Sequence, residues 1–353
     1  MRLFKEELLK KKPEDRVEYF RGVIVYHPNL VAARDKILNL IRRPGHRIIY
    51  CVGPTSTGKT TLVDAIEKAL TQEFDFSAHP GEMPVAGIEA VSPENGDYNW
   101  KDHYIRAREA LNEPELGRIP ATQYRRLLEQ DLRQRKPKAF IIDEAQHLGK
   151  VRKREKFIDQ LDFIKSLVNT TKTTHVLFGT YELLDLIRFN GQLARRSTLV
   201  HFPRYFNNAK DLTNFMGILN DLQQQMPLEV EPDLVSYYQE LYAMSLGTPG
   251  LLKDMLTAAL DDALKQGLKT VDIDFVAERA LPNDMLMTIL EENIRGEKRM
   301  ANRGSLDEVK AKLGVATEEE EDANQRPRRQ GKPFARKPHR LPIGLSAATQ
   351  PKT

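Results

Sequence analysis

The most constraining feature of the sequence is the octapeptide GPTSTGKT at Gly53–Thr60, which fits the pattern GxxxxGK[ST]. The short apolar run Ile48–Val52 precedes it and predicts a buried strand. Lys59–Leu70 follows with apolar residues at four-residue spacing, which predicts a helix. A glycine-rich turn between a strand and a helix aims backbone N–H groups at one point, and the helix N-terminus adds partial positive charge. The sequence therefore predicts a phosphate-binding loop, with an ordinary glycine turn as the alternative.

The side chains of this loop suit a nucleoside triphosphate with its metal ion. We expect Lys59 to reach the β- and γ-phosphates as a catalytic residue, and the Thr60 hydroxyl to bind Mg²⁺. ATP and Mg²⁺ are therefore the predicted cofactors. The residues expected to surround the nucleotide are Gly53, Pro54, Thr55, Ser56, Thr57, Gly58, Lys59, Thr60 and Thr61.

A second part of the site is predicted at Ala139–Glu144, where the letters AFIIDE place two carboxylates after four apolar residues. In open parallel sheets, ligands bind at the carboxyl ends of the strands. We expect Asp143 to bind the nucleotide-associated Mg²⁺ and Glu144 to act as the general base that polarises the attacking water. The second acid favours hydrolysis over mere nucleotide storage.

Three weaker candidates follow along the chain. Thr180 comes after the apolar run HVLFG and is predicted to contact the γ-phosphate or water, the alternative being a helix-capping threonine. Arg195 and Arg196 precede a predicted strand and are candidates for a catalytic finger that reaches the nucleotide of a neighbouring subunit, the alternative being surface charge. Lys253 is a candidate for phosphate contact from the C-terminal half.

Apolar runs alternate with helical periodicity up to Pro203, which predicts an α/β fold with a parallel sheet covered on both faces. The expected strands are 48–52, 84–91, 138–143, 175–179 and 198–202. Residues 92–112 read as polar and irregular, and only helical periodicity follows Pro203. The predicted domains are an N-terminal helical extension broken at Pro13 (1–25), an α/β nucleotide-binding domain (26–206), a helical lid (207–285), and a C-terminal helix with a disordered basic tail (286–353).

Charge is unevenly distributed over the 353 residues. The net charge is +4, yet Arg326–Thr353 holds eight basic residues and no acidic one, which leaves −4 for residues 1–325. The acidic run Glu318–Asp322 precedes this basic tail, and such blocks are typical of disorder. The tail suits DNA or a protein partner, or it only aids solubility.

Composition excludes several other classes of protein. The chain has no apolar run of about 18 residues and no apolar N-terminal segment, so we expect no membrane partner and no signal peptide. Its single cysteine, Cys51, excludes an internal disulfide. A cytoplasmic location is the expectation.

The motifs together resemble AAA+ ATPases: the GxxxxGKT loop, DEAQHL at Asp143–Leu148, a threonine after the fourth predicted strand, an arginine pair and a helical lid. DEAQHL, LARRS and SLGTPGLLKDML further resemble the TnsC/TniB transposition regulators, which are related more distantly to MuB. The resemblance covers roughly residues 20–285. It implies an AAA+ P-loop NTPase with a parallel sheet core and a C-terminal helical lid.

This resemblance also implies a function. It implies an ATPase that oligomerises on double-stranded target DNA as a ring or helical filament, links a target-selection protein to the transposase, and disassembles on ATP hydrolysis. A helicase loader or replication-initiator-like ATPase, or a signalling NTPase scaffold, is the alternative. The sequence leaves the targeting factor and the subunit number open.

One position departs from related initiator ATPases, which carry an arginine three residues after the glycine of the lid motif. Here that position is Gly250, so contact from the lid falls to Lys253 or is absent. By position alone, the resemblance places the adenine pocket near Tyr26, His27 and Pro28.

Predicted DNA contacts are basic residues that follow the DEAQHL segment, where such ATPases project loops towards DNA. These are Lys150, Arg152, Lys153 and Arg154, with Lys101 beside Trp100 as a further candidate. Since the sequence shows no recognition-helix or zinc-finger motif, we expect contacts to the DNA backbone without sequence readout. A solvated helix start is the alternative for the basic cluster.

Overall fold

The computed structural model describes residues 3–43, 45, 48–93, 96–150, 154–188, 197–302 and 306–313, without the side chains of 154–162, 186–188 and 306–307. The chain divides into two units, Met1–Lys298 and Arg299–Thr353. The second unit contains helix α14, Leu306–Leu313. The predicted basic tail lies outside the described residues.

A five-stranded parallel sheet forms the centre of the first unit, in the order β2–β3–β4–β1–β5. All five predicted strands are confirmed within one or two residues: β1 Ile48–Val52, β2 Val85–Glu89, β3 Ala139–Asp143, β4 Thr174–Gly179 and β5 Ser197–His201. Since every strand runs in the same direction, their carboxyl ends meet at one edge of the sheet. The phosphate loop follows β1 at this edge, and the predicted carboxylates lie at the end of β3.

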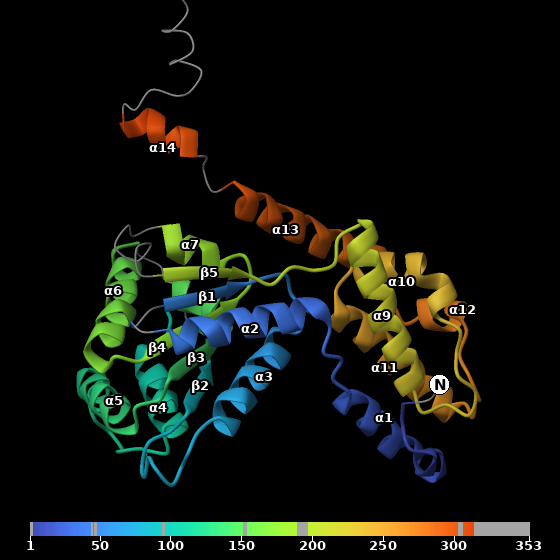
Figure 1. The fold of residues 1–353 in the computed structure, drawn as a ribbon, viewed down its shortest axis with the longest axis horizontal. Coiled ribbons are helices and arrows are strands. Elements are labelled where there is room, and N and C mark those ends of the chain that lie inside the picture. The colour runs from blue at the N-terminus through green and yellow to red at the C-terminus, as the bar shows by residue number, and fades with distance from the viewer. Residues whose placement is uncertain are drawn as a thin grey trace, which may run out of the picture. The chain divides into compact units, whose positions relative to one another are not determined.

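Helices cover both faces of this sheet (Figure 1). Helices α2 (Pro28–Arg42) and α3 (Lys59–Gln72) pack on one face, against alternate strand residues such as Ile49 and Cys51. The other face is covered by α4 (Trp100–Ala110), α5 (Ala121–Arg135), α6 (Arg154–Thr171) and α7 (Leu183–Arg188). Burial on both faces explains the continuous apolar character of the strands.

The prediction of an irregular segment over residues 92–112 is wrong for its second half. Helix α4 begins there after Asn99, whose side chain accepts a hydrogen bond from the backbone N–H of Asp102 and caps the helix. His103, Tyr104 and other residues of one helix face are buried. Polar and aromatic residues make up much of this face, which is why hydrophobic periodicity did not reveal the helix.

The helices after Pro203 form a second core of their own. They are α9 (Ala209–Gln225), η3 (Val235–Tyr237), α10 (Tyr238–Ser245), α11 (Pro249–Lys265) and α12 (Ile273–Ala277). Helix α13 (Asn283–Ala301) follows them in the chain. The N-terminal elements are η1 (Glu6–Lys10) and α1 (Pro13–Gly22), and α1 adds Val17 and Phe20 to this core. Pro13 therefore begins a helix. The predicted domain boundaries stay a prediction.

Within the described residues, every helix is too short or too polar to cross a lipid bilayer.

Candidate nucleotide-binding site

The phosphate loop turns sharply between β1 and α3. Gly58 has a φ of 91° and Ser56 a φ of 58°, so both lie in the left-handed region. Glycine adopts this region at little cost, which suits Gly58 to the residue before the helix. The hydroxyl of Thr57 donates a hydrogen bond of 3.0 Å to the Pro54 carbonyl and closes the turn. The predicted strand–loop–helix arrangement is confirmed.

Lys59 is buried, and its hydrogen bonds in the structure go to the loop itself. Its Nζ donates to the Pro54 carbonyl at 2.6 Å and to the Gly53 carbonyl at 3.4 Å. Burial lowers the pKa of Lys59, and the charge of Glu144 opposes that change. A buried ammonium held only by neutral carbonyls gains from an anionic partner. These surroundings therefore fit a phosphate group.

Thr60 and Asp143 lie side by side at the edge of the sheet. The Thr60 hydroxyl donates to Asp143 Oδ2 over 3.1 Å, and the backbone N–H of Glu144 donates to Asp143 Oδ1 over 2.9 Å. A hydroxyl and a carboxylate are hard oxygen ligands of the kind that Mg²⁺ prefers. The pair fits the predicted role in holding the metal.

Glu144 and Thr180 are brought together by a residue to which the sequence analysis assigned no role. The side-chain amide of Gln146 donates to a Glu144 carboxylate oxygen, and its carbonyl accepts from the backbone N–H of Thr180 at 3.2 Å. Gln146 is the glutamine of DEAQHL, so the motif contained the signal. Its partners became visible only in the structure.

An apolar pocket adjoins the phosphate loop. It lies between the N-terminal segment and the helices α9 and α11. Val23, Val25, Ile218 and Leu222 supply apolar surface, and Thr57 and Gly58 of the loop form part of the lining. His27, predicted near the adenine, also lines the pocket, whereas Tyr26 lies outside its lining and is half-exposed.

The protonation of His27 follows from its contacts. Burial lowers its pKa to about 4, so the imidazole is neutral near pH 7. Its Nδ1 accepts a hydrogen bond from the backbone N–H of Leu30 and lies 2.8 Å from the Tyr205 hydroxyl. A neutral imidazole that accepts at Nδ1 carries its hydrogen on Nε2. His27 can therefore offer a donor to a ligand.

Lys253 lines the same pocket, and its predicted contact with phosphate stays a prediction. Its Nζ donates to the carbonyl oxygens of Arg21, at 2.6 Å, and Val23. The lysine therefore ties α11 to the last turn of α1 and to the residue that follows that helix. The sequence did not reveal that the carbonyl oxygens of Arg21 and Val23 lie close to α11.

Gly250 shows why the lid has no arginine at this position. Its backbone N–H donates to the Ser56 carbonyl at 2.8 Å. A Cβ added to Gly250 would lie 2.3 Å from that same carbonyl oxygen. A side chain at this position would collide with the phosphate loop, so Gly250 contacts the loop through its backbone.

Only part of the predicted DNA surface can be located. Lys150 is exposed, and its carbonyl oxygen accepts a hydrogen bond of 3.1 Å from the backbone N–H of Tyr98. Lys101 Nζ lies 5.7 Å from the centre of the Tyr124 ring. Arg152 and Lys153 lie outside the described residues, as do the predicted fingers Arg195 and Arg196. The side chain of Arg154 is not described either.

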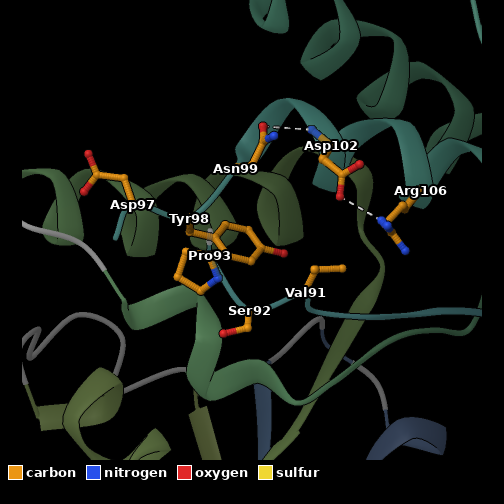
Figure 2. Close-up of a pocket in the computed structure, with 8 residues that line it drawn as sticks. All are labelled: Val91, Ser92, Pro93, Asp97, Tyr98, Asn99, Asp102 and Arg106. Carbon is orange, nitrogen blue, oxygen red and sulfur yellow. Dashed lines mark hydrogen bonds and ion pairs between the residues drawn. The ribbon is translucent and has the colours of Figure 1, made fainter. Parts of the chain in front are cut away.

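A polar pocket opens between the end of β2 and the start of α4 (Figure 2). Asp97, Asp102 and Arg106 are among its lining residues, and Arg106 Nε lies 2.7 Å from an Asp102 carboxylate oxygen. This pocket contains none of the residues predicted to bind nucleotide. We therefore place the candidate site at the phosphate loop.

Comparison with known proteins agrees with this geometry. Residues 42–187 match the AAA domain family. The fold is that of AAA+ P-loop NTPases. The predicted fold class is therefore confirmed. No curated protein matches the chain by sequence.

Two solved structures from Aeropyrum pernix illustrate the likeness. The ORC1 protein in complex with DNA has a TM-score of 0.54 and 17% identity, covering 78% of this chain and 68% of that one. The ORC2 protein, in its ADPNP–ADP complexes, has a TM-score of 0.51 and 14% identity, covering 74% and 70%. At this level of identity the likeness concerns the fold alone.

Proposed function

We propose that this chain binds and hydrolyses ATP, and that the nucleotide controls its association with double-stranded DNA. The observation that carries the proposal is the convergence of Lys59, Thr60, Asp143 and Glu144 at one edge of the sheet. These four residues combine a buried cation, two hard oxygen ligands and a further carboxylate. This set suits hydrolysis of a nucleoside triphosphate.

Each residue has a distinct task in this proposal. Lys59 exchanges its bonds to loop carbonyls for bonds to the β- and γ-phosphates. Thr60 and Asp143 hold Mg²⁺, which neutralises charge on the phosphates when bound. Glu144 accepts the proton of the attacking water. Thr180, at the end of β4, orients that water or the γ-phosphate.

The apolar pocket beside the loop suits the base of the nucleotide. Apolar side chains on α9 and the N-terminal segment provide surfaces for a flat ring. In this proposal the Nε2–H of His27 donates a hydrogen bond to a ring nitrogen of the base. We therefore keep His27 as an adenine-site residue and give Lys253 the role of securing the pocket wall.

DNA binding is proposed through Lys101, Lys150, Arg152, Lys153 and Arg154. The related ORC1 fold was solved with DNA, which is consistent with such a role. Contacts to phosphates make the affinity salt-dependent, with a log–log slope of roughly −0.9 per phosphate neutralised. Charge reversal of Lys150, Arg152 and Lys153 is therefore expected to weaken binding and to flatten that slope.

We further propose that the chain oligomerises on target DNA and links a target-selection protein to a transposase. In such an oligomer, Arg195 or Arg196 would be the catalytic finger that reaches the nucleotide bound to a neighbouring subunit. The motifs DEAQHL, LARRS and SLGTPGLLKDML support this choice. A replication-initiator-like ATPase is the second candidate because its fold is similar. Gly250 argues against this second candidate. Its contact with Ser56 leaves no room at position 250 for the arginine that related initiators carry there.

The variant Lys59→Ala tests the nucleotide switch. We expect it to abolish ATP binding and ATP-dependent binding to a fluorescent DNA duplex, as measured by titration. Lys68→Ala, an exposed lysine on the same helix, is the matched control and should behave like the unaltered protein. DNA binding that is equally ATP-dependent in Lys59→Ala would refute the proposal.

Electron microscopy distinguishes the two candidates. The protein is mixed with duplexes of unrelated sequence and a slowly hydrolysed ATP analogue. Rings or continuous filaments on every duplex support the transposition regulator. Isolated particles confined to one sequence support the initiator.

A further inference from the structure

We infer that Gln146 is a positioning residue that couples the general base Glu144 to the phosphate loop. This inference rests on the proposed hydrolysis of ATP and concerns its regulation. Gln146 lies in the short helix η2 (Ala145–Gly149), directly after β3, and its side chain is buried against the end of β4. The hydrogen bonds of its side chain go to Glu144 and Thr180 and not to the proposed metal ligands.

Both ends of the Gln146 amide are engaged. The NH₂ group donates to Glu144, and the carbonyl accepts from the N–H of Thr180. A carboxylate accepts hydrogen bonds and a backbone N–H donates them, so these two partners allow only one orientation of the amide. The position of the Glu144 carboxylate is thereby tied to the backbone at Thr180.

The peptide group between Gly179 and Thr180 extends this connection to the phosphate loop. Its N–H bonds to Gln146, while its carbonyl accepts from the backbone N–H of Gly53 at 3.3 Å. One rigid peptide plane thus links the first residue of the loop to Gln146 and through it to Glu144. A displacement of either end is passed on through hydrogen bonds.

Gly179 makes the close approach of Gln146 possible. A Cβ at this position would lie 2.5 Å from Gln146 Oε1 and 3.4 Å from the Gln146 backbone nitrogen. A side chain there would push the amide away from Thr180. The glycine at the end of β4 is therefore needed for the hydrogen bond between Gln146 and Thr180.

The backbone conformation of Glu144 also requires contacts that hold this residue in place. Its φ of 51° is unusual for a residue with a long side chain. The turn is held on one side by Asp143, which accepts from the Glu144 N–H, and the side chain is held by Gln146. Loss of the amide leaves the carboxylate free to sample other rotamers.

Gln146→Met tests the coupling, because methionine preserves length and approximate volume but makes neither hydrogen bond. We expect kcat for ATP hydrolysis to fall roughly 10- to 100-fold, as for a misplaced catalytic group. KM and the affinity for a slowly hydrolysed ATP analogue should stay within about twofold, given that nucleotide binding does not use Gln146. Gln266→Met, at an exposed position after α11, is the control.

A double-mutant cycle with Glu144→Gln separates positioning from general destabilisation. If Gln146 acts through Glu144, Gln146→Met causes no further loss of kcat in the Glu144→Gln background. Additive losses would overturn the inference, as would unchanged or increased kcat in the single variant.

A second substitution keeps the test valid if Gln146→Met does not fold. Gln146→Leu also removes both hydrogen bonds but leaves a smaller apolar side chain, and it should lower kcat in the same way. Thermal unfolding identifies the folded variants. Absence of ATP hydrolysis in the unaltered protein would instead refute the proposed function, so the two failures are distinguishable.

Discussion

The hydroxyl of Thr60 donates a hydrogen bond of 3.1 Å to Asp143 Oδ2, although 83 positions separate the two residues in the chain. Thr60 lies in the first turn of α3, and Asp143 is the last residue of β3. Their contact joins the phosphate loop to the carboxylates at the sheet edge. This contact is the basis of the proposed metal site.

The first prediction concerns this pair. In Asp143→Asn, the metal ligand loses its charge while the loop and Lys59 remain. We expect the affinity for ATP with Mg²⁺ to fall about 10-fold or more, and the affinity in EDTA to change little. Titration of a fluorescent ATP analogue with and without Mg²⁺ measures both values. An equal loss under both conditions would argue against a metal role.

The second prediction concerns the base. Glu144→Gln keeps the size of the side chain but cannot accept a proton from water. We expect hydrolysis to fall by roughly 10²- to 10⁴-fold, with ATP affinity retained. ATP-bound assemblies on DNA should consequently persist longer than those of the unaltered protein, as followed by light scattering. Wild-type turnover would show that Glu144 is not the base.

The third prediction concerns the contact between lid and loop. A methyl group in Gly250→Ala would meet the Ser56 carbonyl, so we expect a loss of roughly 1–3 kcal/mol in unfolding free energy and weaker ATP binding. Gly217→Ala, in α9, is the control because its added Cβ meets no atom within 4 Å. Urea unfolding compares the two. Equal stability of both variants would contradict the prediction.

The fourth prediction concerns pH. Burial lowers the pKa of His103 to about 3 and the pKa values of His27 and His175 to about 4, against 6.5 for an ordinary histidine. Below pH 6.5 the unfolded chain therefore binds more protons than the folded one at these sites. The free energy of unfolding consequently decreases as the pH is lowered.

Each of these histidines should cost roughly 1–2 kcal/mol of unfolding free energy between pH 7 and pH 5. Urea unfolding at the two pH values measures the total. His103→Gln should flatten the dependence, because it removes one of the three buried imidazoles. A stability that rises towards pH 5 in the unaltered protein, and a slope unaffected by His103→Gln, would contradict this account.

Much of the fold was predictable because short sequence patterns indicate its strands and the phosphate loop. Five apolar runs marked the five strands, and GPTSTGKT marked the loop between β1 and α3. The shared edge of a parallel sheet also predicted that Thr60 and Asp143 would lie near each other. Helix α4 escaped prediction because aromatic and charged residues cover its buried face.

The sequence by itself determined the strand–loop–helix unit, the α/β class and the carboxylates at the end of β3. Only the tertiary structure decided that Gln146 lies between Glu144 and Thr180, that Gly250 contacts Ser56, and that Lys253 turns towards Val23. Periodicity reports which face of an element is buried, since that depends on neighbours along the chain. Hydrogen-bond partners depend on distances of a few ångströms between segments that are remote in sequence, and packing alone sets those distances.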